Sequence, residues 1–312
     1  MSPRRTIGVD AGGTKLLVGV VGPDLAVGYR RHALWDGNGS NEVVEQMLAA
    51  VSAALDAAPD AMGVGFGIPA LVDSRSGVAR SSVHLPLEGI DLGAIARERF
   101  GLPAVVDNDA NAAMLCEHRH GAARGASHAA LLTIGTGIGG GLIIDGRLYR
   151  GADGFGAELG HMVVDVDGFP CAEGCPGIGC LEALVSGSAI GRAGEASELG
   201  LASAGQVTGR TVTEAALAGD AAGLSIVDHA GRSLGAGLVS IVNALNPEVI
   251  VIGGGVMALG ELLLGPAREV VMERALRPSR EAVRIVPAEF GEDAGMVGAA
   301  LMAAGATEER AL

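Results

Sequence analysis

The chain has 312 residues, which corresponds to two domains of ordinary size or to one large domain. Apolar residues make up 49% of it and charged residues 19%, so a sizeable core can be buried and wholesale disorder is disfavoured. Lys and Arg number 22 against 36 Asp and Glu, and this net charge of −14 argues against nucleic acid and anionic membranes as partners. The composition is that of a soluble acidic enzyme.

The start of the chain lacks the apolar stretch of a secretory signal, because the short run from Thr6 to Asp10 follows the first residues at once. The longest uncharged run, about 129 to 144, is shorter than the roughly 20 apolar residues of a membrane helix, and glycines interrupt it. We therefore expect a cytoplasmic protein.

The first half of the chain predicts an α/β unit. Two β-rich runs are joined by a glycine turn, which is typical of a hairpin, and a later run has apolar residues at helical spacing. The expected elements, in chain order, are a hairpin over 7–21, a strand beginning near Ala26, a helix over 41–58, a strand over 62–66, a helix over 92–100, a strand over 104–106 and a helix from Asp109 onward.

The second half repeats this theme with a strand over 130–134, a glycine turn over 135–141 and a strand over 142–144. Later, a strand over 249–252 runs into three glycines. Helices are expected at about 231–245, 261–275 and 295–304. Two copies of a hairpin followed by strands and helices indicate two related α/β lobes, with a boundary near 115–128.

The glycine turns suggest an anion site. Gly135-x-Gly137-x-x-Gly140 matches the dinucleotide-binding pattern, but a strand rather than a helix is expected to follow it, so we exclude an NAD site. A glycine turn with a Thr can still bind phosphate through its backbone amides and hydroxyl. One such turn alone is equally well a tight hairpin. Two turns that each carry a Thr, one per lobe, favour a shared phosphate.

A set of motifs, taken in order, resembles those of the ROK family of sugar kinases. The resemblance runs from residue 7 to about residue 300. The motifs are Asp10-Ala-Gly-Gly-Thr-Lys15, Asp107-Asn-Asp-Ala-Asn111, Gly135-Thr-Gly-Ile-Gly-Gly140, Glu158-Leu-Gly-His161 and Gly179-Cys-Leu-Glu182.

The resemblance implies an α/β fold of the two-lobed, actin-like and hexokinase-like ATPase type, with duplicated βββαβα-type domains. We expect an N-terminal lobe over 1–118 and a C-terminal lobe over 119–312, with a zinc-binding insert at about 158–182. The alternative that the last helix packs back on the N-terminal lobe stays open.

The resemblance also implies a site for ATP and Mg²⁺, with Asp10 near the metal ion and its waters. The other implied nucleotide contacts are Gly12, Gly13, Thr14 and Lys15 on the phosphates, Thr136 and Gly137 on the phosphates, and Gly254 and Gly255 on the nucleotide.

Asp107, Asn108 and Asp109 follow an apolar strand and precede a helix, so helix capping alone can explain them. Phosphoryl transfer to an alcohol additionally needs a carboxylate within reach of the attacking hydroxyl. By resemblance, Asp109 is the catalytic base that takes the proton from the 6-hydroxyl of a sugar, Asn108 hydrogen-bonds the sugar, and Gly67 lies in the sugar site.

Glu158, His161 and Glu182 match the sugar-binding positions of the family, although for each taken singly a solvated surface residue is the favoured interpretation. His84 stands where many glucokinases of the family have Asn, so it either alters the preference among hexoses or simply faces solvent.

His161, Cys171, Cys175 and Cys180 have the spacing H-x9-C-x3-C-x4-C, which suits a closed, structural Zn²⁺ site. The alternative is three buried free thiols. The family has C-x-C where this chain has the longer spacing from Cys171 to Cys175, which leaves Cys171 open to question as a ligand. By resemblance, His161 uses one ring nitrogen for zinc and the other for sugar. Cys116 is interpreted as a core residue.

The leading hypothesis is an ATP-dependent hexose kinase with glucose as the expected sugar, acting as a homodimer or higher homo-oligomer. Mannose, fructose or an N-acetylated amino sugar are alternatives, and polyphosphate is not excluded as a donor. A sugar-responsive regulator of the same family would need an N-terminal DNA-binding domain, and a first strand at Ile7 leaves no room for one. A non-catalytic sugar-binding protein is opposed by the presence of both Asp10 and Asp109.

Overall fold

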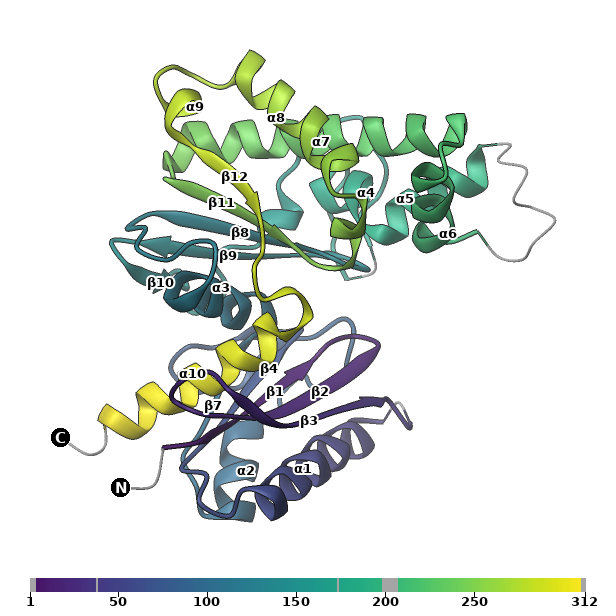
Figure 1. The fold of residues 1–312 in the computed structure, drawn as a ribbon. Coiled ribbons are helices and arrows are strands. Elements are labelled where there is room, and N and C mark those ends of the chain that lie inside the picture. Colours follow the sequence, from purple (N-terminus) through teal and green to yellow (C-terminus); the bar gives the residue numbers. More distant parts are fainter. Residues whose placement is uncertain (1–3, 38, 173, 198–206, 310–312) are drawn as a thin grey trace. The chain divides into compact units, whose positions relative to one another are not determined.

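The computed structural model describes residues 4–37, 39–172, 174–197 and 207–309. The chain divides into two compact units (Figure 1). Unit 1 consists of residues 1–121, 148–157 and 292–312, and unit 2 consists of residues 122–147 and 158–291. The chain therefore passes from unit 1 to unit 2 and back more than once.

Unit 1 is built on a five-stranded sheet with the strand order β3-β2-β1-β4-β7. The first three strands are antiparallel neighbours, and β4 and β7 run parallel to β1. A short two-stranded sheet, β5-β6, accompanies it. The strands are β1 (Thr6–Ala11), β2 (Lys15–Val21), β3 (Val27–Leu34), β4 (Val64–Ile68), β5 (Leu71–Val72), β6 (Ala79–Ser81) and β7 (Ala104–Asn108).

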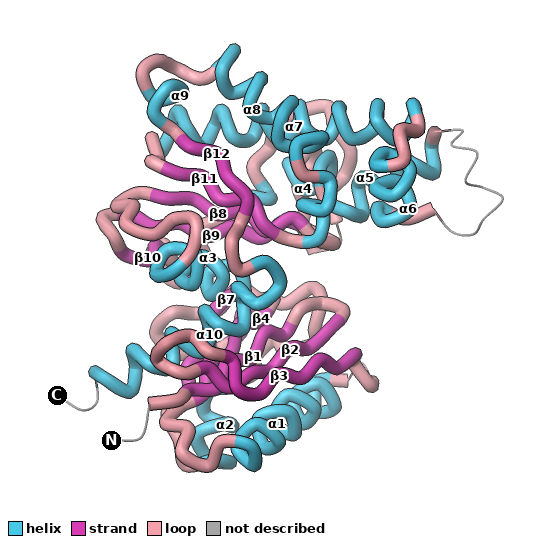
Figure 2. Tube along the Cα trace, viewed as in Figure 1, coloured by secondary structure: helices cyan, strands magenta, loops and turns pink. Residues whose placement is uncertain are grey.

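The helices of unit 1 are α1 (Ser40–Ala57), α2 (Leu92–Phe100), α3 (Asp109–His120) and α10 (Ala294–Glu309). Helix α1 packs on β1 and β2 through the apolar face that its spacing predicts, with Val44, Met47 and Val51 buried. Helices α3 and α10 pack on each other and on the central strands, and α10 lies on the opposite side of the sheet from α1 (Figures 1 and 2). The buried hydroxyl of Thr6 donates to the backbone oxygen of Ala300 at 2.9 Å, which joins β1 to α10.

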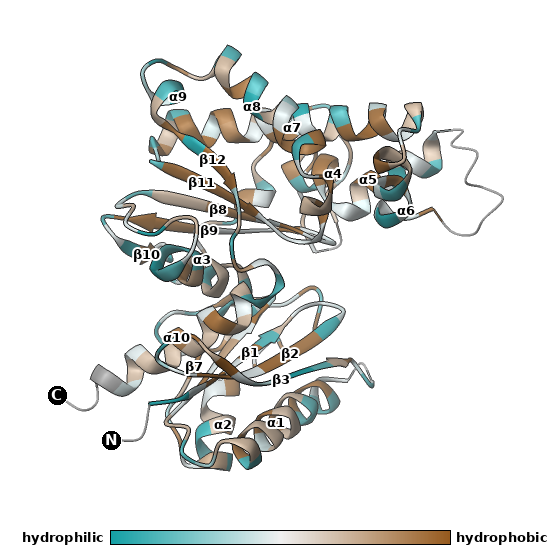
Figure 3. Cartoon of the chain, viewed as in Figure 1, coloured by the Kyte–Doolittle hydropathy of each residue, from teal (hydrophilic) through white to brown (hydrophobic). Residues whose placement is uncertain are grey.

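Unit 2 repeats the strand arrangement of unit 1. Its five-stranded sheet has the order β10-β9-β8-β11-β12, with β9 antiparallel to β8 and with β11 parallel to both β8 and β12. Figure 3 shows strongly hydrophobic residues along β11, all of which are buried. The strands are β8 (Ala129–Ile134), β9 (Ile138–Ile144), β10 (Arg147–Tyr149), β11 (Val249–Gly253) and β12 (Arg284–Pro287).

The helices of unit 2 are α4 (Leu181–Val185), α5 (Gly187–Ala196), α6 (Gly209–Leu217), α7 (Ala221–Leu245), α8 (Glu261–Arg274) and α9 (Ser279–Ala282). Short 3-10 turns occur at η1 (Leu159–His161), η3 (Gly255–Leu259) and, at the crossing to unit 1, η4 (Gly291–Asp293). Helix α7 packs on α8 and on α4 to α6. Across the part of the chain that the structure describes, no helix combines the length and apolar character needed to cross a membrane.

The duplicated α/β architecture predicted from the sequence is confirmed, since the two sheets have the same strand order. Two details differ. Gly139 to Gly141 were expected in a turn but lie in β9, because each pairs with a residue of β8 and this pairing outweighs the poor strand propensity of glycine. Helix α7 begins ten residues earlier than the expected start at 231, where the carboxylate of Asp220 caps its first turn by accepting from the Gly223 amide at 2.8 Å.

Candidate functional site

In unit 1, three neighbouring parallel strands bring polar residues to one edge of the sheet. Asp10 in β1 is in register with Gly67 in β4, and Gly67 is in register with Asp107 in β7. These residues lie at the carboxyl ends of their strands, where α/β proteins bind ligands. The sequence motifs around residues 10, 67 and 107 are thus brought together, although they are about 40 to 60 positions apart.

Asn108 and Asp109 lie at the start of α3, next to this edge. The Asn108 side-chain oxygen accepts from the amides of Ala110 and Asn111 at 2.9 and 3.1 Å, so Asn108 does cap the helix. Its side-chain nitrogen donates to the backbone oxygen of Ala70 at 3.4 Å. Asp109 is half-buried, and its carboxylate also accepts from the Ala110 amide at 2.9 Å. Gly67 packs close to Asp109, because a Cβ on Gly67 would be 3.3 Å from the Asp109 Cα.

The carboxylates of Asp10 and Asp109 are electrostatically linked. Burial raises the pKa of Asp109, and the amide of Ala110 and the nearby His84 oppose that shift. Burial, followed by the charge of Asp109, raises the pKa of Asp10 from 3.8 to about 7, against the opposing charge of Lys15. A pair of carboxylates held in this way is suited to accept a proton near neutral pH or to face a cation.

The turn between β1 and β2 presents Gly13, Thr14 and Lys15 at the surface. The indole nitrogen of Trp35 donates to the backbone oxygen of Gly12 at 2.9 Å and holds the base of the turn. Exposed amides, a Thr hydroxyl and a Lys ammonium group are all groups that can donate hydrogen bonds to an anion.

Two side chains adjoin the turn between β1 and β2. The Lys15 ammonium pairs with the Glu292 carboxylate at 3.0 Å, which ties the turn to η4, directly before α10. His84 is exposed but lies against Gly13, since a Cβ on Gly13 would be 3.0 Å from the His84 Cβ. His84 is therefore a neighbour of the turn as well as a solvent-facing residue.

The corresponding turn of unit 2 lies between β8 and β9. The Gly135 amide donates to the Gly137 backbone oxygen at 2.9 Å, and Thr136 at the tip is exposed. Gly254 follows β11 at the same edge of the second sheet and lies against the backbone of Ile134. Gly255 begins η3. The predicted contacts in this half of the chain therefore also gather at the carboxyl edge of parallel strands.

Glu182 has a more specific environment than the sequence indicated. Its side chain is buried, and one carboxylate oxygen accepts from the Ile138 amide at 2.6 Å. A Cβ on Gly137 would lie 2.5 Å from that same oxygen, so glycine at 137 leaves room for the carboxylate in its present position. The other oxygen is 3.8 Å from the Cys171 sulfur. Glu182 therefore joins the glycine turn to the cysteine cluster.

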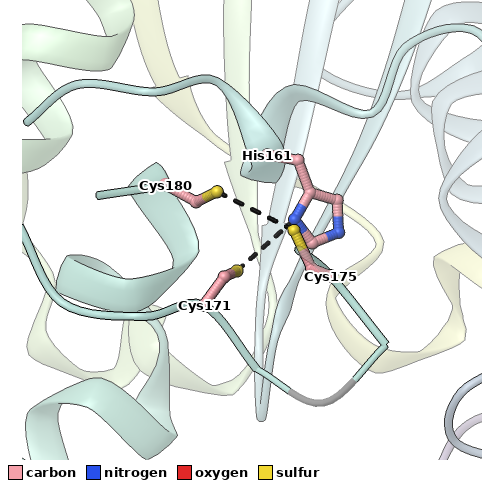
Figure 4. A group of neighbouring side chains, drawn as sticks. All are labelled: His161, Cys171, Cys175 and Cys180. Atoms are coloured by element: carbon pink, nitrogen blue, oxygen red, sulfur yellow. Dashed lines mark hydrogen bonds between the residues drawn. The ribbon is translucent and has the colours of Figure 1, made fainter. Parts of the chain in front are cut away.

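His161, Cys171, Cys175 and Cys180 converge, with one ligand atom from each lying within 4.8 Å of the others (Figure 4). The Cys171 sulfur is 3.5 Å from His161 Nδ1, and the Cys175 and Cys180 sulfurs are 3.9 Å apart. Figure 4 shows the other ring nitrogen of His161 turned away from Cys171 and Cys180. The longer spacing between Cys171 and Cys175 does not keep Cys171 out of the cluster.

The donor set of this cluster fits zinc. Three thiols and one imidazole supply four ligands of the kinds that tetrahedral Zn²⁺ prefers, and a set of this composition leaves no position for water. Burial raises the pKa of the Cys171 and Cys180 thiols, so binding a cation there must displace protons. Cys116 is fully buried in α3 and belongs to the core, as expected.

Glu158 immediately precedes η1 and is half-buried.

Two further residues at these sites were not indicated by any sequence motif. Glu292 reaches Lys15 from 277 positions away, and Arg150 reaches Asp107 from 43 positions away. A single charged residue outside any sequence motif gives no local signal of its contacts, so these two pairs become visible only in the folded structure.

Two sheets of identical strand order, each with a glycine turn and further site residues at its carboxyl edge, define the class of hexokinase-like ATPase folds. Residues 6–306 match the ROK family. The chain belongs to the ROK family.

Three relatives illustrate the range of the family. A glucokinase of Thermotoga maritima is 36% identical, with 96% of this chain and 97% of that protein covered. The crystal structure of a ROK family glucokinase from Streptomyces griseus in complex with glucose and AMPPNP is 33% identical, has a TM-score of 0.87, and covers 96% of this chain and 99% of that one. A ROK family transcriptional regulator, a homologue of the E. coli MLC protein, is 25% identical with a TM-score of 0.86, and 78% of its chain is covered.

Proposed function

We propose that this protein is an ATP-dependent hexose kinase that transfers the γ-phosphoryl group of ATP to the 6-hydroxyl of glucose. Membership of the ROK family and full-length similarity to glucokinases support the activity and the sugar. The observation that carries the proposal is in unit 1, where Asp109 at the start of α3 and Asp10 at the end of β1 interact at one sheet edge. A base and a cation-facing carboxylate are what phosphoryl transfer to an alcohol requires.

Asp109 is the proposed general base. In its ionised form it accepts the proton of the sugar 6-hydroxyl as that oxygen attacks the γ-phosphorus, and the bond to the leaving ADP oxygen breaks. Its raised pKa makes it a stronger proton acceptor than an ordinary carboxylate. Asn108 and Gly67 adjoin Asp109 and are the proposed sugar contacts in unit 1.

The proposed nucleotide contacts are the exposed turns. In unit 1, phosphate oxygens accept from the amides of Gly12 and Gly13, the Thr14 hydroxyl and the Lys15 ammonium. Lys15 is now paired with Glu292, so the phosphate must compete with that carboxylate. When bound, Mg²⁺ supplies neutralisation of phosphate charge, and Asp10 is the residue that would hold its waters. The proposed contacts in unit 2 are Thr136, Gly137, Gly254 and Gly255.

Glu158, His161 and Glu182 are the proposed sugar contacts in unit 2. Zn²⁺ is the proposed structural metal of His161, Cys171, Cys175 and Cys180. With Nδ1 of His161 facing the cluster, its second ring nitrogen is available for a hydroxyl of the sugar. We further expect the enzyme to act in the cytoplasm and as a homo-oligomer.

The test is a coupled assay of ADP formation with glucose, mannose, fructose and N-acetylglucosamine, with ATP or polyphosphate as donor. We expect ATP with glucose to give the highest kcat/KM. A higher kcat/KM with another hexose would change the proposed sugar and leave the proposed kinase activity in place. No hexose-dependent turnover of either donor would contradict the proposal and favour the regulatory branch of the family.

A further inference from the structure

Residues 148–157 belong to unit 1, although residues of unit 2 precede and follow them in the chain. They are called the 148–157 segment below. The Ser74 amide donates to the Asp153 backbone oxygen at 2.9 Å, and Arg75 pairs with the Asp153 carboxylate. Gly154 has φ +109°, and a Cβ there would lie 2.1 Å from the backbone oxygen of Val72, so only glycine allows this approach. The segment is therefore fixed on unit 1 beside β5.

Arg150 lies in this segment and reaches the edge of the first sheet. Its Nε donates to Oδ2 of Asp107 at 2.6 Å. The Asp107 side chain is 8% exposed and the Arg150 side chain 37% exposed, so the carboxylate is inside the protein while part of the guanidinium faces solvent. A buried carboxylate needs such a partner, because its charge is otherwise poorly solvated.

The second oxygen of Asp107 holds the beginning of α3. Oδ1 accepts from the Asn108 amide at 2.8 Å and from the Asn111 side-chain nitrogen at 3.0 Å. Asn108 in turn caps the helix on which Asp109 is the first residue. A chain of hydrogen bonds thus runs from Arg150 through Asp107 to the backbone that carries Asp109.

We propose that Arg150 is a positioning residue for phosphoryl transfer: by pairing with Asp107 it fixes the first turn of α3 and hence the place of the base, Asp109. The inference rests on the proposed function. Without the guanidinium, the Asp107 carboxylate turns toward water and releases the Asn108 amide and the Asn111 side chain. The first turn of α3 then loosens, and Asp109 is held less accurately against the sugar hydroxyl. A displacement of about 1 Å at a reacting group is enough to cost on the order of 100-fold in rate.

The kinetic test compares Arg150→Ala with Arg75→Ala in the full-length protein. Arg75→Ala is the matched control, because it removes an ion pair of the same segment without touching Asp107. We expect Arg150→Ala to lower kcat at least about fivefold relative to Arg75→Ala, with the KM for ATP unchanged. Arg150→Lys, which keeps a cation but loses the Nε geometry, should fall between Arg150→Ala and the native protein. A kcat for Arg150→Ala within fivefold of the control would overturn the proposal.

Hydrogen exchange gives a readout that does not depend on turnover. Peptides containing residues 108–111 should exchange faster in Arg150→Ala and in Asp107→Asn, but not in Arg75→Ala. Unchanged exchange there in Arg150→Ala would overturn the proposal. If the native protein shows no hexose-dependent turnover, the proposed function fails, whereas the exchange experiment still decides whether Arg150 orders the start of α3.

Discussion

The two units share a strand order but carry different chemistry at the same edge of the sheet. At the edge of unit 1 lie the carboxylates Asp10 and Asp109 and an exposed turn that ends in Lys15. At the edge of unit 2 lies a glycine turn without carboxylates of its own, held from behind by buried Glu182 and a cysteine cluster. The two units thus share a scaffold, while their loops differ: those of unit 1 bring carboxylates to the sheet edge, and those of unit 2 order a glycine turn.

The comparison makes a general prediction. Substitutions at the edge of unit 1 should change the chemical step and leave the fold intact, whereas substitutions behind the turn of unit 2 should first loosen the structure.

Asp109→Asn should lower kcat by ~10²- to 10⁴-fold, because the amide cannot accept the proton of the attacking hydroxyl. The KM for glucose and the thermal stability should change little, since the amide keeps an oxygen for the Ala110 amide. Steady-state kinetics measure both. Asp60→Asn, at an exposed carboxylate paired with Arg5, is the control and should retain activity. Near-native turnover of Asp109→Asn would remove Asp109 from the base role.

Cys175→Ser should abolish the proposed zinc binding and lower the melting temperature, because a structural metal contributes its binding free energy to folding. Elemental analysis and thermal unfolding measure the two effects. Cys116→Ser, which changes a thiol outside the cluster, should keep the metal. Equal metal content in the two variants would show that the cluster does not bind zinc.

Glu182→Ala should cost ~1–3 kcal/mol in the free energy of unfolding, because the Ile138 amide loses its buried acceptor. Glu182→Gln keeps an acceptor oxygen and should cost less. Denaturant unfolding measures the cost, and hydrogen exchange at Ile138 shows where it arises. If both variants were as stable as the native protein, Glu182 would have no role in ordering the turn.

Asp10→Asn should stabilise the nucleotide-free protein at high pH while impairing turnover. The pKa of Asp10 is raised from 3.8 to about 7 on folding, so its ionised form destabilises the native state. That cost is absent below about pH 4, grows as the pH rises and is complete above about pH 7. The melting temperature of the variant should therefore exceed that of the native protein by a few degrees at pH 8 and match it near pH 4. A difference independent of pH would contradict the shift.

Much of this architecture was readable from the sequence, for physical reasons. The run 249–252 is short, unbroken and rich in β-branched residues, and three glycines follow it, so its assignment as a buried strand needed no tertiary information. Helix α7 was harder, because small residues such as Gly223 and Ala230 weaken the helical pattern at its start while packing closely in the fold.

The site was predicted where residue types cluster locally and missed where they do not. The motif at 107–111 placed Asn108 and Asp109 at a helix start, which the structure confirms. It did not reveal that Asp107 is bonded to Arg150, since that contact depends on how the 148–157 segment folds back. Likewise, Glu182 was predicted only as a sugar contact. Its hydrogen bond from the Ile138 amide could not be predicted, because a backbone donor far along the chain produces no sequence motif.

Helix α10 has a consequence for how the chain is made. It packs on β1, β4 and α3, yet in chain order it follows every element of unit 2. During synthesis, the part of the first sheet that α10 covers must stay uncovered while the ribosome translates the whole of unit 2. Unit 2, which the 148–157 segment interrupts, has all of its residues once position 291 is translated, but unit 1 cannot be completed until α10 has left the exit tunnel. Unit 2 is therefore the part of this protein that can reach its native structure first, despite being encoded second.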